Sequence, residues 1–124
     1  MALQQDIGKL GEDLAVQCLE AHGHTILQRN WRHRHEEIDI ISKDGDEIVL
    51  TEVKCRSGQP ADAPFRSVGT DKRRLLVRAA NAFIRQFHIK EEVRFDVVSI
   101  ELGPPRRIEY IPRAFYPPVS GSRK

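Results

Sequence analysis

Three charged residues in the first half of the chain have types and a spacing suited to hydrolytic chemistry. Glu52 and Lys54 stand two residues apart in an apolar stretch, so on a strand they project from the same face. Asp39 interrupts a run of isoleucines in the preceding segment. If a hairpin pairs the two segments, Asp39 and Glu52 could converge on one divalent cation, because Mg²⁺ is typically held by one or two carboxylates. Lys54 could then orient or help to deprotonate an attacking water and stabilise charge growing on a phosphate.

A second interpretation of this pattern involves no catalysis. Unpaired charge is costly to bury, so Glu52 and Lys54 need a metal, a partner charge or solvent as compensation. A salt bridge between Glu52 and Lys54 on an edge strand, with Asp39 in solvent, would supply it. Because Glu-x-Lys alone is a weak signal, the elements that position these residues must decide between the two interpretations.

Hydrophobic periodicity predicts a helix, three strands, a second helix and two further strands. The expected helices cover residues 6–22 and 70–87, and the expected strands cover 25–31, 37–42, 47–56, 93–102 and 107–111. Residues 43–46 contain Asp-Gly and are expected to form a hairpin turn, whereas 57–66 read as a loop. A hairpin followed by a helical crossover implies an α/β fold, with a mixed sheet flanked by helices.

The first predicted helix contains two glycines and is followed by a third. Gly23 is well placed to end it in a left-handed conformation. Gly8 and Gly11 lie inside it, where each costs up to about 1 kcal/mol relative to alanine. They therefore indicate either close approach of another backbone or a later helix start.

Length and composition limit the remaining choices. The chain has 124 residues, 40% hydrophobic and 31% charged, which favours one globular domain and excludes a fibrous or disordered chain. We expect this domain to cover residues 1–116, with a loose tail over 117–124. No apolar run is long enough to span a bilayer, and the first residues do not resemble a signal peptide. The two cysteines form no CxxC motif, which fits a reducing cytoplasm.

The charge is divided unevenly along the chain. Residues 1–62 have a net charge of −5 and residues 63–124 a net charge of +7. The second predicted helix carries four basic residues that we take as candidates for binding nucleic acid: Lys72, Arg73, Arg74 and Arg78. Such a helix suits a polyanionic partner, although basic residues also simply solvate helix faces.

Five short motifs in order give a more specific indication. They are Gly8-Lys9-Leu10-Gly11-Glu12, Glu37-Ile38-Asp39-Ile40-Ile41, Glu52-Val53-Lys54, the basic helix that begins near Lys72, and Arg94-Phe95-Asp96-Val97-Val98. Together they resemble the YraN-like bacterial proteins, a family of predicted endonucleases similar to archaeal Holliday-junction resolvases in the PD-(D/E)XK nuclease superfamily. The resemblance covers roughly residues 7–115.

The resemblance implies a restriction-endonuclease-like αβββαβ core and a DNA endonuclease that depends on Mg²⁺ or Mn²⁺. In such a protein Asp39 and Glu52 would be metal ligands, and Lys54 would be the catalytic lysine. Glu12 would be the additional acidic residue of the site and a third metal ligand. Lys72 would contact the phosphate backbone or stabilise the site.

Other residues allow a structural interpretation. Glu12 would also suit a helix N-terminus by its charge alone, and Glu37 could share the face of Asp39 or lie on the surface. We expect Asp96 to pair with an arginine. Two His-x-His pairs could in principle bind zinc, but we expect all four histidines to be exposed to solvent: His22, His24, His33 and His35.

Two classes of function therefore remain. The first is a magnesium-dependent endonuclease that cuts DNA, with branched DNA as a candidate substrate. The second is a nucleic-acid-binding module with a nuclease-like fold that is not catalytic or needs a partner subunit. Resolvase-like proteins usually act as dimers, because symmetric cutting of two strands favours a two-fold axis, so a homodimer is the candidate assembly.

Overall fold

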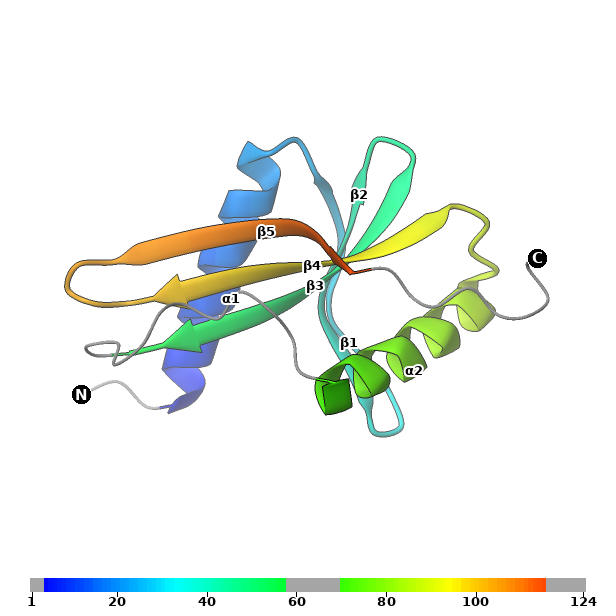
Figure 1. The fold of residues 1–124 in the computed structure, drawn as a ribbon, viewed down its shortest axis with the longest axis horizontal. Coiled ribbons are helices and arrows are strands. Elements are labelled where there is room, and N and C mark those ends of the chain that lie inside the picture. The colour runs from blue at the N-terminus through cyan, green and yellow to red at the C-terminus, as the bar shows by residue number, and fades with distance from the viewer. Residues whose placement is uncertain (1–3, 58–69, 116–124) are drawn as a thin grey trace.

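The computed structural model describes residues 4–57 and 70–115 (Figure 1). Its elements are α1 (Gln4–Ala21), β1 (Thr25–His33), β2 (Glu36–Asp44), β3 (Glu47–Arg56), α2 (Thr70–Phe87), β4 (Glu92–Glu101) and β5 (Arg107–Phe115). This is the predicted order of helices and strands. Most of the predicted loop over 57–66, and the whole predicted tail over 117–124, lie outside the described residues.

The five strands form one mixed sheet in the order β1-β2-β3-β4-β5. The β1–β2, β2–β3 and β4–β5 pairs are antiparallel, whereas β3 and β4 are parallel and are joined by the crossover that contains α2. The α/β class and the mixed sheet flanked by helices are confirmed, and the arrangement is consistent with the restriction-endonuclease-like core. In this arrangement β3, which carries Glu52 and Lys54, is the central strand.

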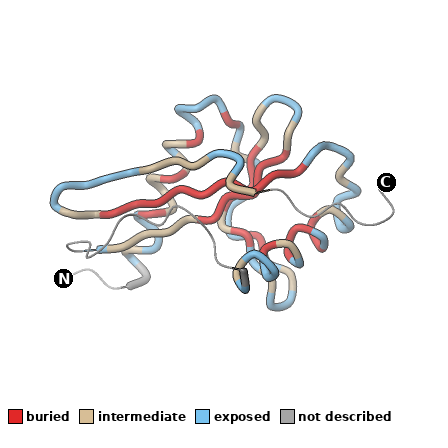
Figure 2. Tube along the Cα trace, viewed as in Figure 1, coloured by how far each residue is buried: buried red, intermediate tan, exposed pale blue. Residues whose placement is uncertain are grey.

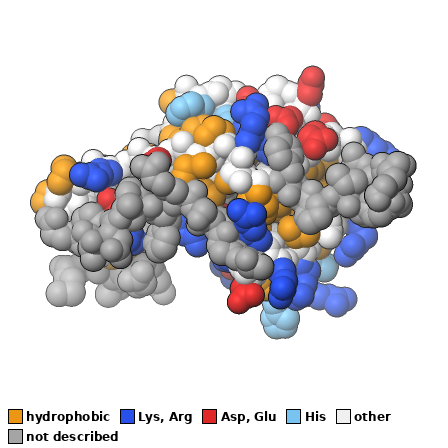
Figure 3. All heavy atoms as spheres, viewed as in Figure 1, with side chains coloured by type: hydrophobic (Ala, Val, Ile, Leu, Met, Phe, Trp, Pro, Cys, Tyr) orange, Lys and Arg blue, Asp and Glu red, His pale blue; other side chains and the backbone are white. Residues whose placement is uncertain are grey.

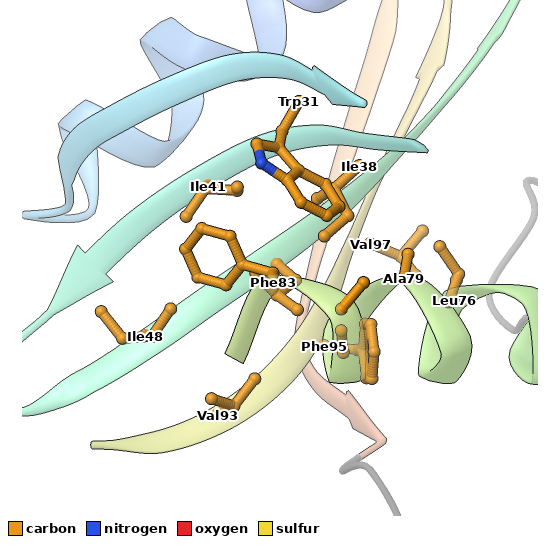
Figure 4. Close-up of a cluster of buried hydrophobic side chains, with 13 residues drawn as sticks. Trp31, Ile38, Ile41, Ile48, Leu76, Ala79, Phe83, Val93, Phe95 and Val97 are labelled. Atoms are coloured by element: carbon orange, nitrogen blue, oxygen red, sulfur yellow. The ribbon is translucent and has the colours of Figure 1, made fainter. Parts of the chain in front are cut away.

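Each face of the sheet is covered by one helix. On one face the apolar side of α2 packs on the sheet, and Trp31 meets Phe83 edge-on with 5.6 Å between ring centroids (Figure 4). On the other face Ala15 and Leu19 of α1 pack against residues of β2 and β4. The middle strands are accordingly the most deeply buried part of the chain (Figure 2). Neither described helix combines the length and apolar character that a membrane crossing requires.

The C-terminus of α1 is fixed by the glycine that the sequence indicates. Gly23 has φ of 91°, and its N–H donates to the carbonyl of Glu20. The N–H of His24 donates to the carbonyl of Leu19, which completes a Schellman motif. The helix starts at Gln4 rather than at residue 6, so a late start does not explain its internal glycines.

Gly11 lies where α1 meets the end of β3. A Cβ added at Gly11 would come within 2.7 Å of both Cβ and Sγ of Cys55, whereas a Cβ at Gly8 would meet nothing within 4 Å. The predicted close approach is therefore real at Gly11, although it is made by a side chain, and absent at Gly8. Cys55 is a partly buried residue of the α1 face, and burial raises the pKa of its thiol.

A charge cluster ties the β2–β3 turn to β4. Arg94 is only 1% exposed and bonds to Asp96, with Nε–Oδ1 at 2.9 Å, to Glu47 at 2.6 Å and to Asp44 at 3.0 Å. Asp96 also accepts the hydroxyl of Tyr110 and the backbone N–H of Arg113 from β5. The expected pairing of Asp96 with an arginine is confirmed, and the cluster joins four strands, β2 to β5.

The two glycines of α1 should respond oppositely to alanine. Gly11→Ala should lower the free energy of unfolding by about 1–3 kcal/mol, because the new methyl group overlaps Cys55. Gly8→Ala should raise it by up to about 1 kcal/mol through helix propensity. Urea denaturation followed by circular dichroism measures both. Equal effects of the two substitutions would contradict the close packing.

Removal of the Arg94 guanidinium should be severely destabilising. Arg94→Met leaves the buried carboxylate of Asp96, and the partly exposed carboxylates of Asp44 and Glu47, without their cation. Removing one partner of a buried ion pair typically costs about 3–5 kcal/mol. Arg85→Met on the exposed side of α2 is the matched control and should change stability by less than about 0.5 kcal/mol. If guanidinium denaturation gave similar midpoints for the two variants, the cluster would not be a main support of the fold.

Candidate functional site

Asp39 lies where β2 separates from β3. The β2–β3 pairs run from Ile40–Thr51 to the turn and include no partner for Asp39. Beyond the last pair, the backbone N–H of Val53 donates to Oδ2 of Asp39 at 2.8 Å. The carboxylate thus takes the place of a strand carbonyl, which holds Asp39 beside the strand that carries Glu52.

Glu52 and Lys54 lie on the same face of β3, as their spacing predicts, and this face is covered by α2. Glu52 is 9% exposed, and its Oε2 lies 3.5 Å from Nζ of Lys54 and 3.3 Å from Nζ of Lys72 on α2. The salt bridge of the non-catalytic interpretation is therefore present. Its edge position holds locally, because the ladder between β2 and β3 ends at Thr51 and Glu52 and Lys54 pair only with β4. Its third element is wrong, because Asp39 is half-buried rather than in solvent.

Few favourable interactions offset the cost of burying the Asp39 carboxylate beside other negative charges. Burial, and then the charge of nearby Glu52, raise its pKa from 3.8 to about 7, although the hydrogen bond from Val53 opposes this shift. Nearby Glu37 raises the pKa further. A cation would relieve the repulsion between Asp39 and Glu52, and two carboxylates match the number of protein ligands that Mg²⁺ commonly takes.

Glu12 lies on the α1 side, away from Glu52. It lines a pocket of about 630 Å³ that also includes Asp39, whereas Asp39 lines a second pocket of about 170 Å³ with Glu52 and Lys72. Asp39 is therefore the member common to both. Within residues 4–57 and 70–115, no group of three or more His, Cys, Asp or Glu side chains is arranged to hold a metal ion. The structure thus brings together Asp39 and Glu52, with Glu12 across a pocket.

The carboxylate of Glu12 is held by β1. Its Oε1 accepts from Nε of Arg29 at 2.9 Å and from Nδ2 of Asn30 at 3.0 Å. Arg29 also bonds to Asp13 at 2.6 Å. Arg29 and Asn30 were not among the residues selected from the sequence. The available signal was an asparagine inside a predicted strand, where this residue type is uncommon.

The arginines proposed to bind nucleic acid lie on α2, where Lys and Arg side chains gather in Figure 3. Arg73, Arg74 and Arg78 are exposed, and Arg73 lies over the ring of Phe115 with 4.8 Å to its centroid. Lys72 differs from them, because it turns toward Glu52. Lys72 therefore belongs to the carboxylate site, and the arginines form a neighbouring basic surface.

Of the remaining candidates, Glu37 and His35 line the smaller pocket with Asp39 and Glu52, and the expectation for His24 needs correction. His24 is 6% exposed, contrary to the expectation that all four histidines face solvent, because it bonds to Ser42 and Tyr110. Burial lowers the pKa of His24. Glu37 is exposed on β2 and lies 3.8 Å from Arg32, yet it also lines the smaller pocket.

Asp39→Asn should stabilise the metal-free protein increasingly as pH rises. The folded pKa of about 7 exceeds the unfolded value of 3.8, so the stability that protonated Asp39 contributes is complete below pH 3.8 and is lost as pH rises through about 7. Asparagine avoids this cost and still accepts from Val53. In EDTA, the gain in unfolding free energy should grow by on the order of 2–4 kcal/mol between about pH 4 and pH 8.

Chemical denaturation at a series of pH values measures this difference. Asp71→Asn, at an exposed position of α2, is the matched control and should show no such trend. A gain for Asp39→Asn that is independent of pH would contradict the raised pKa.

Comparison with known proteins identifies a family. A family model described as "Uncharacterised protein family UPF0102" matches residues 11–100. A UPF0102 protein of Bacteroides thetaiotaomicron is 43% identical over 121 residues, which are 96% of this chain and 99% of the relative. A UPF0102 protein of Dictyoglomus turgidum is 36% identical over 115 residues, which are 90% of this chain and 98% of the relative. A UPF0102 protein of Clostridium kluyveri is 45% identical over 100 residues, which are 80% of this chain and 82% of the relative. The chain therefore belongs to the UPF0102 family.

Proposed function

We propose that this protein is a metal-dependent endonuclease that hydrolyses DNA phosphodiester bonds, similar to the resolvase-like members of the PD-(D/E)XK superfamily. The observation that carries the proposal is the pair of half-buried and buried carboxylates, Asp39 and Glu52, with Lys54 and Lys72 on the same oxygen of Glu52. Carboxylates that are incompletely neutralised in a cleft, beside two lysines, are typical of sites that bind a cation and a phosphate.

Each side chain of the site has a role in this proposal. Asp39 and Glu52 would hold Mg²⁺ or Mn²⁺, which when bound would supply Lewis acidity and make a water more acidic. Lys54 would hold a phosphate oxygen and orient the attacking water. Lys72 would neutralise Glu52 and contact the DNA backbone. The half-buried position of Asp39, held by Val53, keeps these groups preorganised.

The exposed arginines of α2 supply the surface for the nucleic acid. Arg74 and Arg78 lie one helical turn apart on the exposed side of α2, whereas Lys72, in the first turn, faces Glu52. A phosphate backbone held by these arginines would pass the start of α2 to reach the carboxylates. Branched DNA is the substrate form to test first, and a homodimer is the assembly that would cut two strands symmetrically. The cytoplasm is the proposed location, because DNA is the proposed substrate and both cysteines are free, as is usual in a reducing compartment.

The same basic surface favours a second candidate, a nucleic-acid-binding module that does not cut or that needs a partner subunit. Such a module requires the arginines but not the carboxylates. Its binding should weaken steeply as salt increases, because bound phosphates release counterions. Binding measurements alone would therefore not separate the two candidates.

Cleavage of a labelled four-way junction, a flap, a duplex and a single strand tests the proposal. We expect cutting with Mg²⁺ or Mn²⁺, no cutting in EDTA, and a loss of at least about 100-fold in Glu52→Ala, because the metal contribution is worth several kcal/mol. Glu20→Ala, at an exposed glutamate of α1, is the matched control and should cut as the parent does.

Two outcomes would contradict an endonuclease. If the parent left all four DNA forms intact but bound them in a salt-sensitive way, the binding module would be favoured. If Glu52→Ala retained the parent's rate, the cutting would come from a contaminating nuclease.

A further inference from the structure

The proposed function assigns no role to the larger of the two pockets that Asp39 lines. This pocket has a volume of about 630 Å³, within the range of about 300–1,000 Å³ that is usual for small-ligand sites. Its lining includes Gly8, Lys9 and Glu12 of α1 and Arg29 and Asn30 of β1. Because Asp39 belongs to the lining as well, a group that fills this pocket would lie beside the candidate cation site.

Nothing in the packing of α1 requires a glycine at position 8. A Cβ added at Gly8 would meet nothing within 4 Å, in contrast to Gly11. Gly8 lies inside α1, where glycine lowers helix stability relative to alanine. The missing side chain leaves open space against the helix backbone at the pocket, and glycine is the residue that lets a ligand approach a backbone closely. Gly8 therefore indicates a ligand that lies against α1.

The cationic side chains of this pocket are already paired with carboxylates. Nη2 of Arg29 lies 2.7 Å from Oε1 of Glu12 and 2.6 Å from Oδ1 of Asp13. Nζ of Lys9 lies 3.3 Å from Oδ2 of Asp13. A phosphate in the pocket would find little uncompensated positive charge and would meet the acidic side chain of Asp39. An uncharged group meets no such repulsion, so the pocket suits a neutral ligand.

The polar groups of the pocket match the hydrogen-bonding and stacking requirements of a nucleobase. Two carboxylates fix the guanidinium of Arg29, and bases stack on the flat face of such a group. Glu12 accepts from Arg29 and Asn30 through Oε1, so its Oε2 can accept from the amino group of a base. Asn30, whose left-handed φ of 54° is unusual in a strand, adds an amide that both donates and accepts. A planar, uncharged ring with N–H donors would satisfy all three side chains.

We propose that this pocket receives one unpaired nucleobase of the DNA, from a nucleotide beside the bond to be cut. The inference rests on the proposed function, which supplies DNA as the ligand and places the reaction at Asp39 and Glu52. A base that is already single-stranded costs the least to take out of the stack, whereas a base within a duplex must first be unpaired. The pocket therefore makes a flap or a junction with unpaired nucleotides a better substrate than a continuous duplex.

Gly8→Leu tests this site while all polar groups of the pocket remain. Leucine fills the open space beside α1 and forms helices better than glycine, so thermal melting should show a variant at least as stable as the parent. Binding is measured in EDTA, which prevents metal-dependent cutting, with a flap and with the same flap made abasic beside the branch. The parent should bind the intact flap about 5- to 150-fold more tightly, the usual contribution of stacking one base. Gly8→Leu should bind the two flaps equally.

Two further variants of α1 serve as references. Gln17→Leu introduces the same side chain at an exposed position outside the pocket, and it should keep the parent's preference for the intact flap. Gly8→Ala adds a single methyl group, so it should retain a smaller preference, which also tests the site if Gly8→Leu did not fold.

The inference is overturned if the parent binds neither flap or binds both equally, or if Gly8→Leu keeps the parent's preference. If the preference depended on Gly8 but no DNA were cut, the proposed endonuclease would fail and the nucleobase site would stand. If cutting depended on Glu52 without any preference for the intact flap, the proposed function would stand and this inference alone would fail.

Discussion

The site depends on one hydrogen bond, from the backbone of Val53 to the side chain of Asp39. Because β2 leaves β3 after Ile40, the N–H of Val53 has no strand carbonyl to pair with on that side. Asp39 supplies the acceptor, and in doing so its carboxylate is drawn into a half-buried position beside Glu52. The same separation of strands opens the sheet there, so that Asp39 lines a pocket toward each helix.

Two acidic side chains of the sheet, Asp96 and Asp39, are buried in different environments. Asp96 accepts hydrogen bonds from Arg94, Tyr110 and the backbone of Arg113. Asp39, in contrast, accepts the backbone N–H of Val53, and its pKa rises to about 7 through burial and the charge of Glu52. A fully bonded carboxylate stabilises a fold, whereas a poorly compensated one costs stability unless a ligand arrives. This contrast is the physical reason to separate a structural cluster from a functional one.

The sequence predicted the bounds of helices and strands correctly where local signals determine them. The bounds of α2 and β3 agree with prediction to the residue, because hydrophobic periodicity and turn residues mark their ends. Strand β5 extends to Phe115 rather than ending at residue 111, since an edge strand tolerates Pro112 and pairs again beyond a register shift. The burial of His24 could not be predicted, because its partner Tyr110 lies 86 residues away.

In the site too, contacts that follow from local sequence signals were predictable and contacts that depend on tertiary packing were not. The proximity of Asp39 and Glu52 follows from a hairpin and strand alternation, which are readable from the chain. The contact of Lys72 with Glu52 depends on how α2 packs, and the contact of Asn30 with Glu12 depends on a left-handed backbone inside β1. Both bring residues from separate elements to a carboxylate, and no periodicity encodes them. The sequence therefore located the acidic groups and Lys72, and the three-dimensional structure showed that Lys72 contacts Glu52 and that Arg29 and Asn30 hold Glu12.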